Sequence, residues 1–326
     1  MPEMSLVQAV NHALARAMAD DPGVLVLGED VGVDGGVFRA TDGLLARFGA
    51  DRVLDTPLAE GAIAGISVGL AAQGLRPVAE IQFTGFIYPT IDQMLNHASR
   101  LRTRTRGRLS CPMVLRSPCG GGIRAVEHHS ESPEALFAHI PGLRVVIPSS
   151  PRRAYGLLLA AIRDPDPVVF LEPTRLYRAV REEVADDGQA LPLDRCFVLR
   201  DGQHVTFVTW GAMVLETLGA AERLAADGIT AEVIDVATLK PIDFDTILGS
   251  VTKTGRCVIV HEAPRTGGGG AEIAAVLAER GLTALLAPVL RVAGWDTVMP
   301  LPRLEHAYLP SVGRIVEAAR HCLEYA

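Results

Sequence analysis

The stretch Asp55–Gly74, DTPLAEGAIAGISVGLAAQG, decides the fold of this chain. After the carboxylate of Glu60 its residues are almost all small or apolar, and charge does not return until Arg76. A helix that is apolar all round is a buried helix, and Pro57 is a residue type that suits a first helical turn. Glycine costs roughly 1 kcal/mol of helix propensity relative to alanine, so the glycines in this stretch indicate close approach by another backbone or a flat ligand.

Two interpretations of Glu60 follow from its place at the head of this predicted helix. A carboxylate there stabilises the positive end of the helix dipole, which is a structural role. A buried carboxylate in the same place is also suited to proton chemistry. The residues of the stretch leave both interpretations open.

The bulk composition excludes several classes of protein. The chain has 326 residues with 48% hydrophobic content, which is enough for two domains with full cores. No apolar run reaches the roughly 18 residues of a membrane span, and the N-terminus lacks the order of a signal peptide. The five cysteines form no CxxC pair, so we expect free thiols, no zinc site and a reducing cytoplasm.

Nucleic-acid binding is also disfavoured. The net charge is -7, and the one basic run, Arg100–Arg108, has no aromatic residues interleaved for stacking on bases. This run is interpreted as a solvated helix face. The glycines of Thr266–Gly270 lack the Gly-Lys-Ser/Thr ending of a phosphate loop, which disfavours nucleotide hydrolysis.

Strands and helices alternate along the whole chain. The predicted strands are Val24–Leu27, Pro77–Ile81, Met113–Arg116, Val145–Pro148, Val168–Leu171, Val205–Thr209, Ala231–Asp235, Cys257–Val260 and Val289–Val292. Helical periodicity falls between them, which predicts an α/β fold with mostly parallel sheets covered on both faces. The polar segment Arg181–Leu193 is the predicted linker, so we expect domains at 1–187 and 188–326.

A glycine-flanked loop carries two adjacent histidines, His128 and His129. Zinc binding there is disfavoured, because no HExxH and no nearby cysteine pair accompanies them. A structural role as loop-capping residues and a role in proton transfer near neutral pH both fit this loop.

Eight motifs of the chain occur in the same order in one family. They are LGEDVG at Leu27–Gly32, DTPLAE at Asp55–Glu60, EIQFTGFIYPTIDQ at Glu80–Gln93, HHSES at His128–Ser132, VVIPSSP at Val145–Pro151, DPVVFLEP at Asp166–Pro173, LKPID at Leu239–Asp243 and RVAGWDTVMP at Arg291–Pro300. Together they resemble the beta subunit of the thiamine-diphosphate-dependent decarboxylase component of 2-oxoacid dehydrogenase complexes. The resemblance implies an N-terminal pyrimidine-binding domain and a transketolase-type C-terminal domain.

The resemblance also implies an activity. It is the decarboxylation of a 2-oxoacid, pyruvate or a branched-chain acid, with transfer of the acyl group to the lipoyl group of an acyltransferase. Glu60 then hydrogen-bonds the pyrimidine ring nitrogen of thiamine diphosphate, which acts as the electron sink. Leu58, Gln82 and Phe86 surround the ring, and Phe86 stands where the family often has tyrosine.

Further site residues follow from the same resemblance. His129 matches the family histidine that assists acyl transfer, and Glu29 matches an acidic path between paired active sites. Ala161, Asp164 and Asp166 match a site for a monovalent cation such as potassium. The segment around Asp296 and the carboxylate of Ala326 match the place where the subunit-binding domain of the acyltransferase docks.

One motif is missing. The wider thiamine family binds the diphosphate and its magnesium ion through a Gly-Asp-Gly followed downstream by asparagine, and this chain lacks that pattern. The chain is therefore expected to hold only the pyrimidine half of the cofactor. An alpha subunit supplies the rest in an alpha-two beta-two heterotetramer.

Alternative functions are a subunit of an acetoin dehydrogenase-type or other transketolase-like thiamine enzyme, and a non-catalytic assembly subunit. The sequence does not decide the 2-oxoacid.

Overall fold

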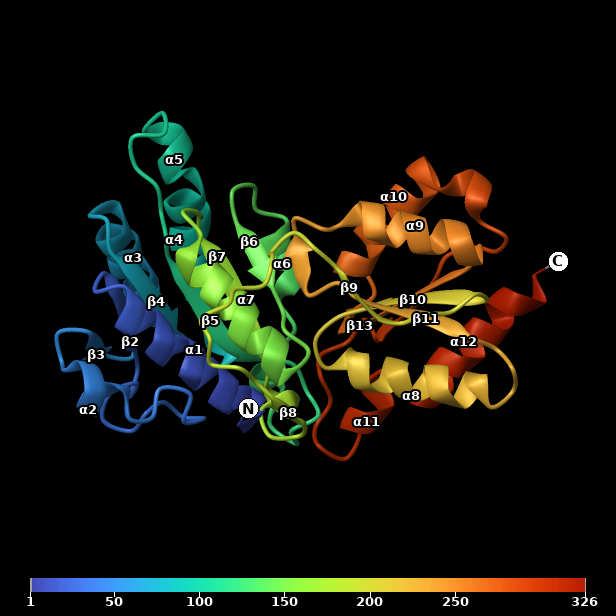
Figure 1. Ribbon diagram of the computed structural model, residues 1–326, viewed down its shortest axis with the longest axis horizontal. Helices are drawn as coiled ribbons and strands as arrows, with labels where there is room; N and C mark the ends of the chain where they lie inside the picture. Colours follow the sequence, from blue (N-terminus) through green and yellow to red (C-terminus); the bar gives the residue numbers. More distant parts are fainter. Residues whose placement is uncertain (1, 326) are drawn as a thin grey trace. The chain divides into compact units, whose positions relative to one another are not determined.

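The structure, a computed structural model, describes residues 2–325 in two compact units (Figure 1). The first unit contains the chain up to Cys119 and the range Leu136–Leu193. The second contains Gly120–Ala135 and the chain from Asp194 onward. The loop with the two histidines therefore belongs to the second unit, although its sequence interrupts the first.

The first unit is built on six parallel strands in the order β6–β7–β5–β4–β2–β3. They are β2 (Val24–Gly28), β3 (Val53–Asp55), β4 (Arg76–Glu80), β5 (Val114–Cys119), β6 (Arg144–Val146) and β7 (Val168–Pro173). The sequence of β2, VLVLG, is buried along its whole length. Continuous apolar runs of this kind are typical of parallel strands covered on both faces, and the predicted parallel sheet is confirmed.

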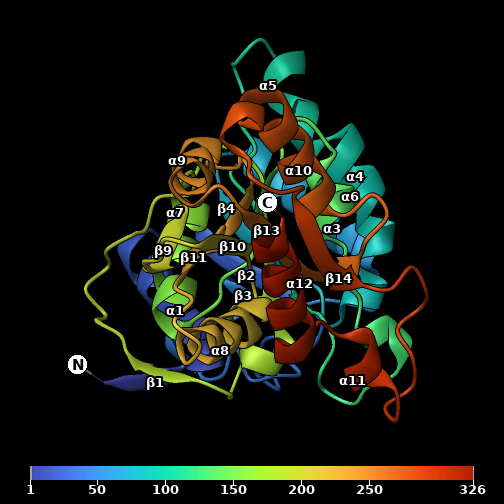
Figure 2. The same cartoon turned by 90° about the vertical axis from the view of Figure 1, so that its right-hand side faces the viewer.

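Helices cover both faces of this sheet. Figure 2 shows α1 (Leu6–Asp20) and α7 (Pro151–Arg163) on one side, and α3 (Glu60–Ala72) and α4 (Ile91–Asn96) on the other. The short helices α2 (Leu44–Phe48), α5 (Leu101–Arg104) and α6 (Glu134–Ala138) complete the series. A capping box is present at the start of α1, with the Ser5 N–H donating to Gln8 Oε1 at 3.0 Å.

The second unit has a five-stranded sheet in the order β14–β13–β10–β11–β9, parallel except for β9. Its strands are β9 (Phe197–Arg200), β10 (Val205–Thr209), β11 (Ala231–Asp235), β13 (Cys257–Pro264) and β14 (Leu290–Gly294), and β12 (Thr238–Lys240) lies outside this sheet. Its helices are α8 (Met213–Ala225), α9 (Phe244–Thr254), α10 (Gly269–Arg280), α11 (Glu305–Tyr308) and α12 (Val312–Glu324). In Figure 1, α8 and α12 lie on one face of this sheet, and α9 and α10 on the other.

The prediction that α3 is buried all round is wrong for this chain. Ile63, Ala64, Ser67 and Ala71 are buried, but Ile66 is 54% exposed. The sheet and α4 cover one side of the helix only, so its second apolar face is left open to solvent. The helix also begins at Glu60, so Pro57 precedes the first turn.

Two further predictions need correction. The sequence between the strands Pro77–Ile81 and Met113–Arg116 predicts one helix around Ile91–Thr103, but that helix is broken at His97, whose φ of −122° and ψ of −65° are not helical. The predicted linker is not all irregular, because β8 (Arg181–Glu183) pairs antiparallel with β1 (Glu3–Ser5). Within residues 2–325, no helix is long and apolar enough to cross a membrane.

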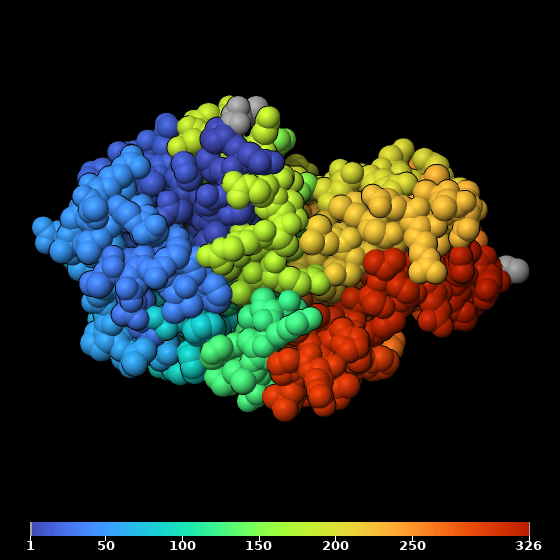
Figure 3. Space-filling view, turned by 90° about the horizontal axis from the view of Figure 1, so that it is seen from below, coloured from blue at the N-terminus to red at the C-terminus, as the bar shows by residue number. Residues whose placement is uncertain are grey.

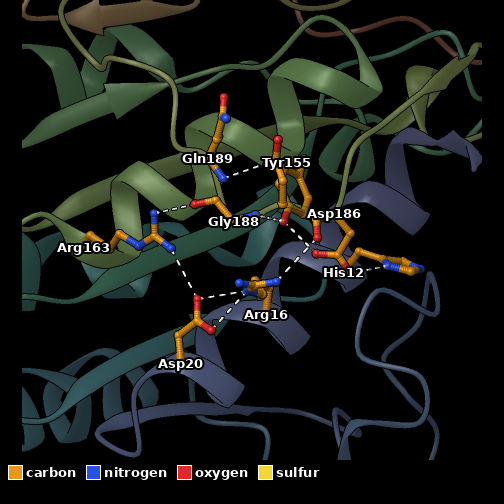
Figure 4. A network of polar contacts seen from close by, with 9 residues as sticks. His12, Arg16, Asp20, Tyr155, Arg163, Asp186, Gly188 and Gln189 are labelled. Atoms are coloured by element: carbon orange, nitrogen blue, oxygen red, sulfur yellow. Dashed lines mark hydrogen bonds and ion pairs between the residues drawn. The ribbon is translucent and has the colours of Figure 1, made fainter. Parts of the chain in front are cut away.

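The polypeptide that follows β8 is fastened to α1 and α7 by a polar network (Figure 4). Tyr155 of α7 is its centre: its hydroxyl donates to Asp186 Oδ1 at 2.7 Å and accepts from the Gly188 N–H at 3.0 Å. Arg163 donates to the Gly188 carbonyl at 2.8 Å, and Arg16 of α1 donates to the Asp186 carbonyl at 3.4 Å. The network therefore fixes the position of the segment by which the chain leaves the first unit.

We predict that Tyr155→Phe weakens the attachment of this segment and lowers the stability of the chain. The change removes one hydrogen bond to a carboxylate and one from a backbone N–H, so the free energy of unfolding should fall by about 1–3 kcal/mol. Urea unfolding measures this loss, and limited proteolysis should cut residues 184–193 faster. The exposed Tyr325→Phe is the control; equal stability of the two variants would contradict the role of the Tyr155 hydroxyl.

Candidate active site

Three neighbouring strands of the first unit end at one edge of the sheet. They are β3, β2 and β4, which pair in parallel register with Gly28 opposite both Asp55 and Glu80. Loops at the carboxyl ends of adjacent parallel strands are where α/β proteins place their sites. The segments after these ends carry Glu29, Glu60 and Gln82.

The turn after β3 presents Leu58 and Glu60. The Thr56 N–H donates to the Gly28 carbonyl at 2.9 Å, which ties this turn to the end of β2. Leu58 is 81% exposed, and Glu60, the first residue of α3, is half-buried. An apolar side chain and a carboxylate two residues apart can together contact an uncharged ring that also donates a hydrogen bond.

The segment after β4 presents Gln82 and Phe86. Gln82 Nε2 donates to the Glu29 carbonyl at 3.3 Å and to Asp30 Oδ2 at 3.2 Å. Phe86 is 37% exposed and lies edge-on to Phe83, with 6.2 Å between the ring centroids. The four predicted cofactor residues thus lie on two segments that leave the ends of β3 and β4, the strands on either side of β2.

Glu29 is the buried carboxyl group of this edge. It is 3% exposed, and its Oε1 has no hydrogen-bond partner within residues 2–325. Burial, and after it the charges of Glu60, Asp30 and Glu80, raise the pKa of Glu29 from 4.5 to about 7. Near neutral pH this group is therefore poised to hold or release a proton.

The glycine-rich loop after β2 closes over these carboxylates. Asp55 accepts the N–H groups of Gly32 at 2.6 Å and Val33 at 3.0 Å, which fixes the start of the loop. Gly36 has a φ of +75°, and a Cβ there would lie 2.8 Å from Glu80 Oε1. Glycine is required at this position both by the backbone conformation and by the close carboxylate.

A buried ion cluster lies beside the site in the same sheet. Arg116 of β5 pairs with Glu80 of β4, and its Nε and Nη2 bind Glu172 of β7 at 2.8 and 2.7 Å. Tyr177 donates to Glu172 at 2.6 Å. Burial raises the pKa of Glu80 despite Arg116, because one guanidinium is shared by two carboxylates. Sequence reasoning missed this cluster, whose only signal is a charge inside three apolar strands.

The residues expected to hold a monovalent cation have other partners. Asp164 pairs with Arg144 at 2.9 Å, and Asp166 pairs with Arg102 at 2.7 Å. The Ala161 carbonyl accepts the Asp164 N–H at 3.3 Å. Across residues 2–325, no three His, Cys, Asp or Glu side chains gather so as to hold a metal ion. A cation at this place would depend on backbone carbonyls, and the site stays a prediction.

His129 ends the short helix Glu127–His129 in the second unit. Its ring lies edge-on to that of His128, with centroids 4.4 Å apart, and His128 Nδ1 lies 3.5 Å from Glu127 Oε1. Burial, and then the neighbouring His128, lower the pKa of His129, so its imidazole is neutral at pH 7. Glu60 belongs to the first unit and His129 to the second.

Two domain families match the chain. The pyrimidine binding domain of transketolase matches residues 2–180, and the transketolase C-terminal domain matches residues 194–315. Among curated proteins, the pyruvate dehydrogenase E1 component subunit beta of Bacillus subtilis is 49% identical over 325 residues, with 100% of both chains covered. The protein of the same name from Staphylococcus epidermidis is 48% identical over the same lengths.

Solved structures agree on the fold. A chain described as a split gene transketolase, inactive beta4 tetramer, has a TM-score of 0.81 at 25% identity and 99% coverage of both chains. A transketolase variant from Pichia stipitis has a TM-score of 0.71 at 12% identity, covering 99% of this chain and 46% of that one. The predicted α/β fold with two transketolase-type domains is confirmed.

The pKa of Glu29 generates a prediction about stability. The folded chain keeps this proton up to about pH 7, whereas the unfolded chain releases it near 4.5, so stability falls as pH rises through that window. Glu29→Gln is neutral at every pH. Its Tm should match the native chain near pH 4.5 and exceed it by a few degrees at pH 8.

Thermal unfolding across this pH range measures the effect. The exposed Glu279→Gln on α10 is the control, and its Tm difference from the native chain should not change with pH. A constant difference for Glu29→Gln as well would show that Glu29 ionises normally.

Proposed function

This chain belongs to the family of pyruvate dehydrogenase E1 component beta subunits, and we propose that it is the beta subunit of a 2-oxoacid dehydrogenase that acts on pyruvate. The observation that carries the proposal is the 49% identity over the whole chain. The names of the relatives favour pyruvate over a branched-chain acid and over an acetoin dehydrogenase-type role. The carboxylate of Glu60 near the buried Glu29 supports a catalytic rather than a purely assembling subunit.

The residues at the strand ends suit one half of thiamine diphosphate. Leu58 and Phe86 offer apolar surface for a flat ring, and Glu60 and Gln82 offer hydrogen-bonding groups. When bound, the cofactor supplies the electron sink for decarboxylation. Glu60 holds a proton at the ring nitrogen, while Leu58 and Phe86 exclude water from its faces.

The same residues do not suit a diphosphate. Glu29, Asp30 and Glu60 bring negative charge to this edge, and phosphates need a metal ion or aimed donors. An alpha subunit would therefore bind the diphosphate and magnesium, in an alpha-two beta-two heterotetramer. The open face of α3 supports this, because Ala62, Ile66 and Gly69 are exposed along one side of the helix.

Acyl transfer to a lipoyl group is assigned to His129, because a neutral imidazole can accept or donate a proton near pH 7. Docking of the acyltransferase is proposed around Asp296, which accepts the Thr266 N–H at 2.9 Å and the Thr266 hydroxyl at 2.7 Å. Ala326, the second docking residue expected from the sequence, lies outside the described residues. The five free thiols support a cytoplasmic location.

The test of substrate is turnover of a panel of 2-oxoacids by this chain co-expressed with its alpha subunit, with a lipoyl domain as acceptor. Pyruvate should give the highest kcat/KM. A preference for branched-chain acids would overturn the choice of substrate but not the family.

We predict that Glu60→Gln leaves folding and assembly intact and lowers kcat by about 10²-fold or more, because an amide cannot hold the proton that a carboxylate holds. Steady-state decarboxylation with an artificial acceptor at saturating cofactor is the measurement. Glu222→Gln, an exposed carboxylate of α8, should keep native turnover. Near-native turnover of Glu60→Gln would remove Glu60 from the mechanism.

We predict that Gly69→Leu prevents assembly with the alpha subunit. A Cβ at Gly69 meets nothing within 4 Å, so the chain alone should fold normally, but a bulky side chain would keep a partner from the open face of α3. Gly249→Leu is the matched control, because Gly249 is also an exposed helical glycine with open space around its Cβ position. Analytical ultracentrifugation should show a heterotetramer for Gly249→Leu only; assembly of both variants would place the interface elsewhere.

A further inference from the structure

Two buried carboxylates of the second unit hold the glycine run that precedes His129. Glu262 of β13 accepts the N–H of Gly121, and Glu305 of α11 accepts the N–H of Gly122 at 2.6 Å and of Arg124 at 3.1 Å. Glu262 and Glu305 are 8% and 5% exposed. Buried carboxylates need donors, and here backbone N–H groups supply them.

The glycines make this arrangement possible. Gly120 and Gly122 have φ of +80° and +83°, which favours residues without a side chain. A Cβ on Gly120 would lie 2.9 Å from Glu262 Oε1, and one on Gly121 would lie 2.6 Å from Met299 Cε. The run Gly120–Gly122 is therefore specified by the two carboxylates and by the segment that leads into α11.

The turn Gly120–Gly122 is continuous with the segment that carries the two histidines. The Gly120 N–H donates to the Glu131 carbonyl at 2.8 Å, so residues 120 and 131 close a loop with His128 and His129 inside it. The Ser130 N–H in turn donates to the Glu127 carbonyl at 2.9 Å. In the space-filling view, the green surface of this loop lies against the orange-red surface of the segment around α11 (Figure 3).

We propose that Glu262 and Glu305 are positioning residues for His129. They fix the first turn of the 120–131 loop, and through it the place of the imidazole that takes part in acyl transfer. The inference rests on the proposed function of His129. The carboxylates of α11 and of the end of β13 thus act on the reaction through His129, and not by touching the substrate themselves.

The hydrogen bonds are tested by hydrogen exchange on the full-length chain. Glu305→Gln keeps one acceptor oxygen for two N–H groups, and Glu305→Ala keeps none. Exchange in a peptide covering residues 119–126 should accelerate in that order, by about tenfold or more for the alanine variant, since the lost bonds have a charged acceptor. Glu262→Gln replaces the carboxylate acceptor by an amide oxygen and should also accelerate exchange. Glu272→Gln, exposed on α10, is the control.

The effect on the reaction is tested by two assays on the chain with its alpha subunit. The Glu305 and Glu262 variants should lower lipoyl-coupled turnover several-fold more than decarboxylation with an artificial acceptor, which is the split expected of His129→Ala. A merely structural role would lower both assays equally.

The outcomes separate this inference from the proposed function. Unchanged hydrogen exchange in residues 119–126 would show that Glu262 and Glu305 do not fix the 120–131 loop, whatever the activity. Accelerated exchange with both assays unchanged or lowered equally would overturn the positioning of His129. Absence of 2-oxoacid turnover in the native pair would overturn the proposed function, and with it the role of His129 in acyl transfer. Accelerated exchange in the variants would still show that Glu262 and Glu305 fix the loop.

Discussion

The sheet of the first unit depends on one buried guanidinium. Arg116 lies on β5 between β4 and β7, and it binds Glu80 on one side and Glu172 on the other. Three adjacent strands are thereby joined near their carboxyl ends by charges that water cannot reach. Removing one partner from such a cluster typically costs about 3–5 kcal/mol, because the remaining charge is left buried without compensation. The geometry of the neighbouring site is set by this constraint, since β4 carries both Glu80 and, two residues later, Gln82.

The cluster also has an electrostatic consequence. Burial is the largest cause of the raised pKa of Glu29, and the charge of Glu80, which shares Arg116 with Glu172, is a smaller cause in the same direction. An edge of this kind repels further anions and favours protonated or neutral groups. That is consistent with a chain that binds an uncharged ring and leaves the phosphates to another subunit. The half-buried Glu60 differs from the other carboxylates of this edge in that it begins a helix.

The sequence predicted the sheets well because their strands are continuous apolar runs: Val205–Thr209 and Ala231–Asp235 have the bounds expected for β10 and β11. It failed where a pattern had a second explanation. The apolar Ile66 and Gly69 indicate burial, but the pattern does not say whether this chain or a partner covers them. Three-residue strands such as β1 and β8 have no periodicity to detect. Arg116 interrupts an apolar strand, and nothing in the sequence says that Glu80 and Glu172 lie beside it, because strand order is not written in any local pattern.

The candidate site shows the same division between local and distant information. Leu58 and Glu60, or Gln82 and Phe86, are near neighbours in sequence, so a motif can group them. Glu262 and Glu305 lie far along the chain from Gly121, and only folding brings them to it. Both glycine-rich loops nevertheless follow one physical rule. Gly36 lies against Glu80, and Gly120 lies against Glu262, each at a positive φ and each too close to a carboxylate for a side chain. In both places the absence of a side chain lets the backbone come close to a buried carboxylate, and this contact favours one conformation of each loop.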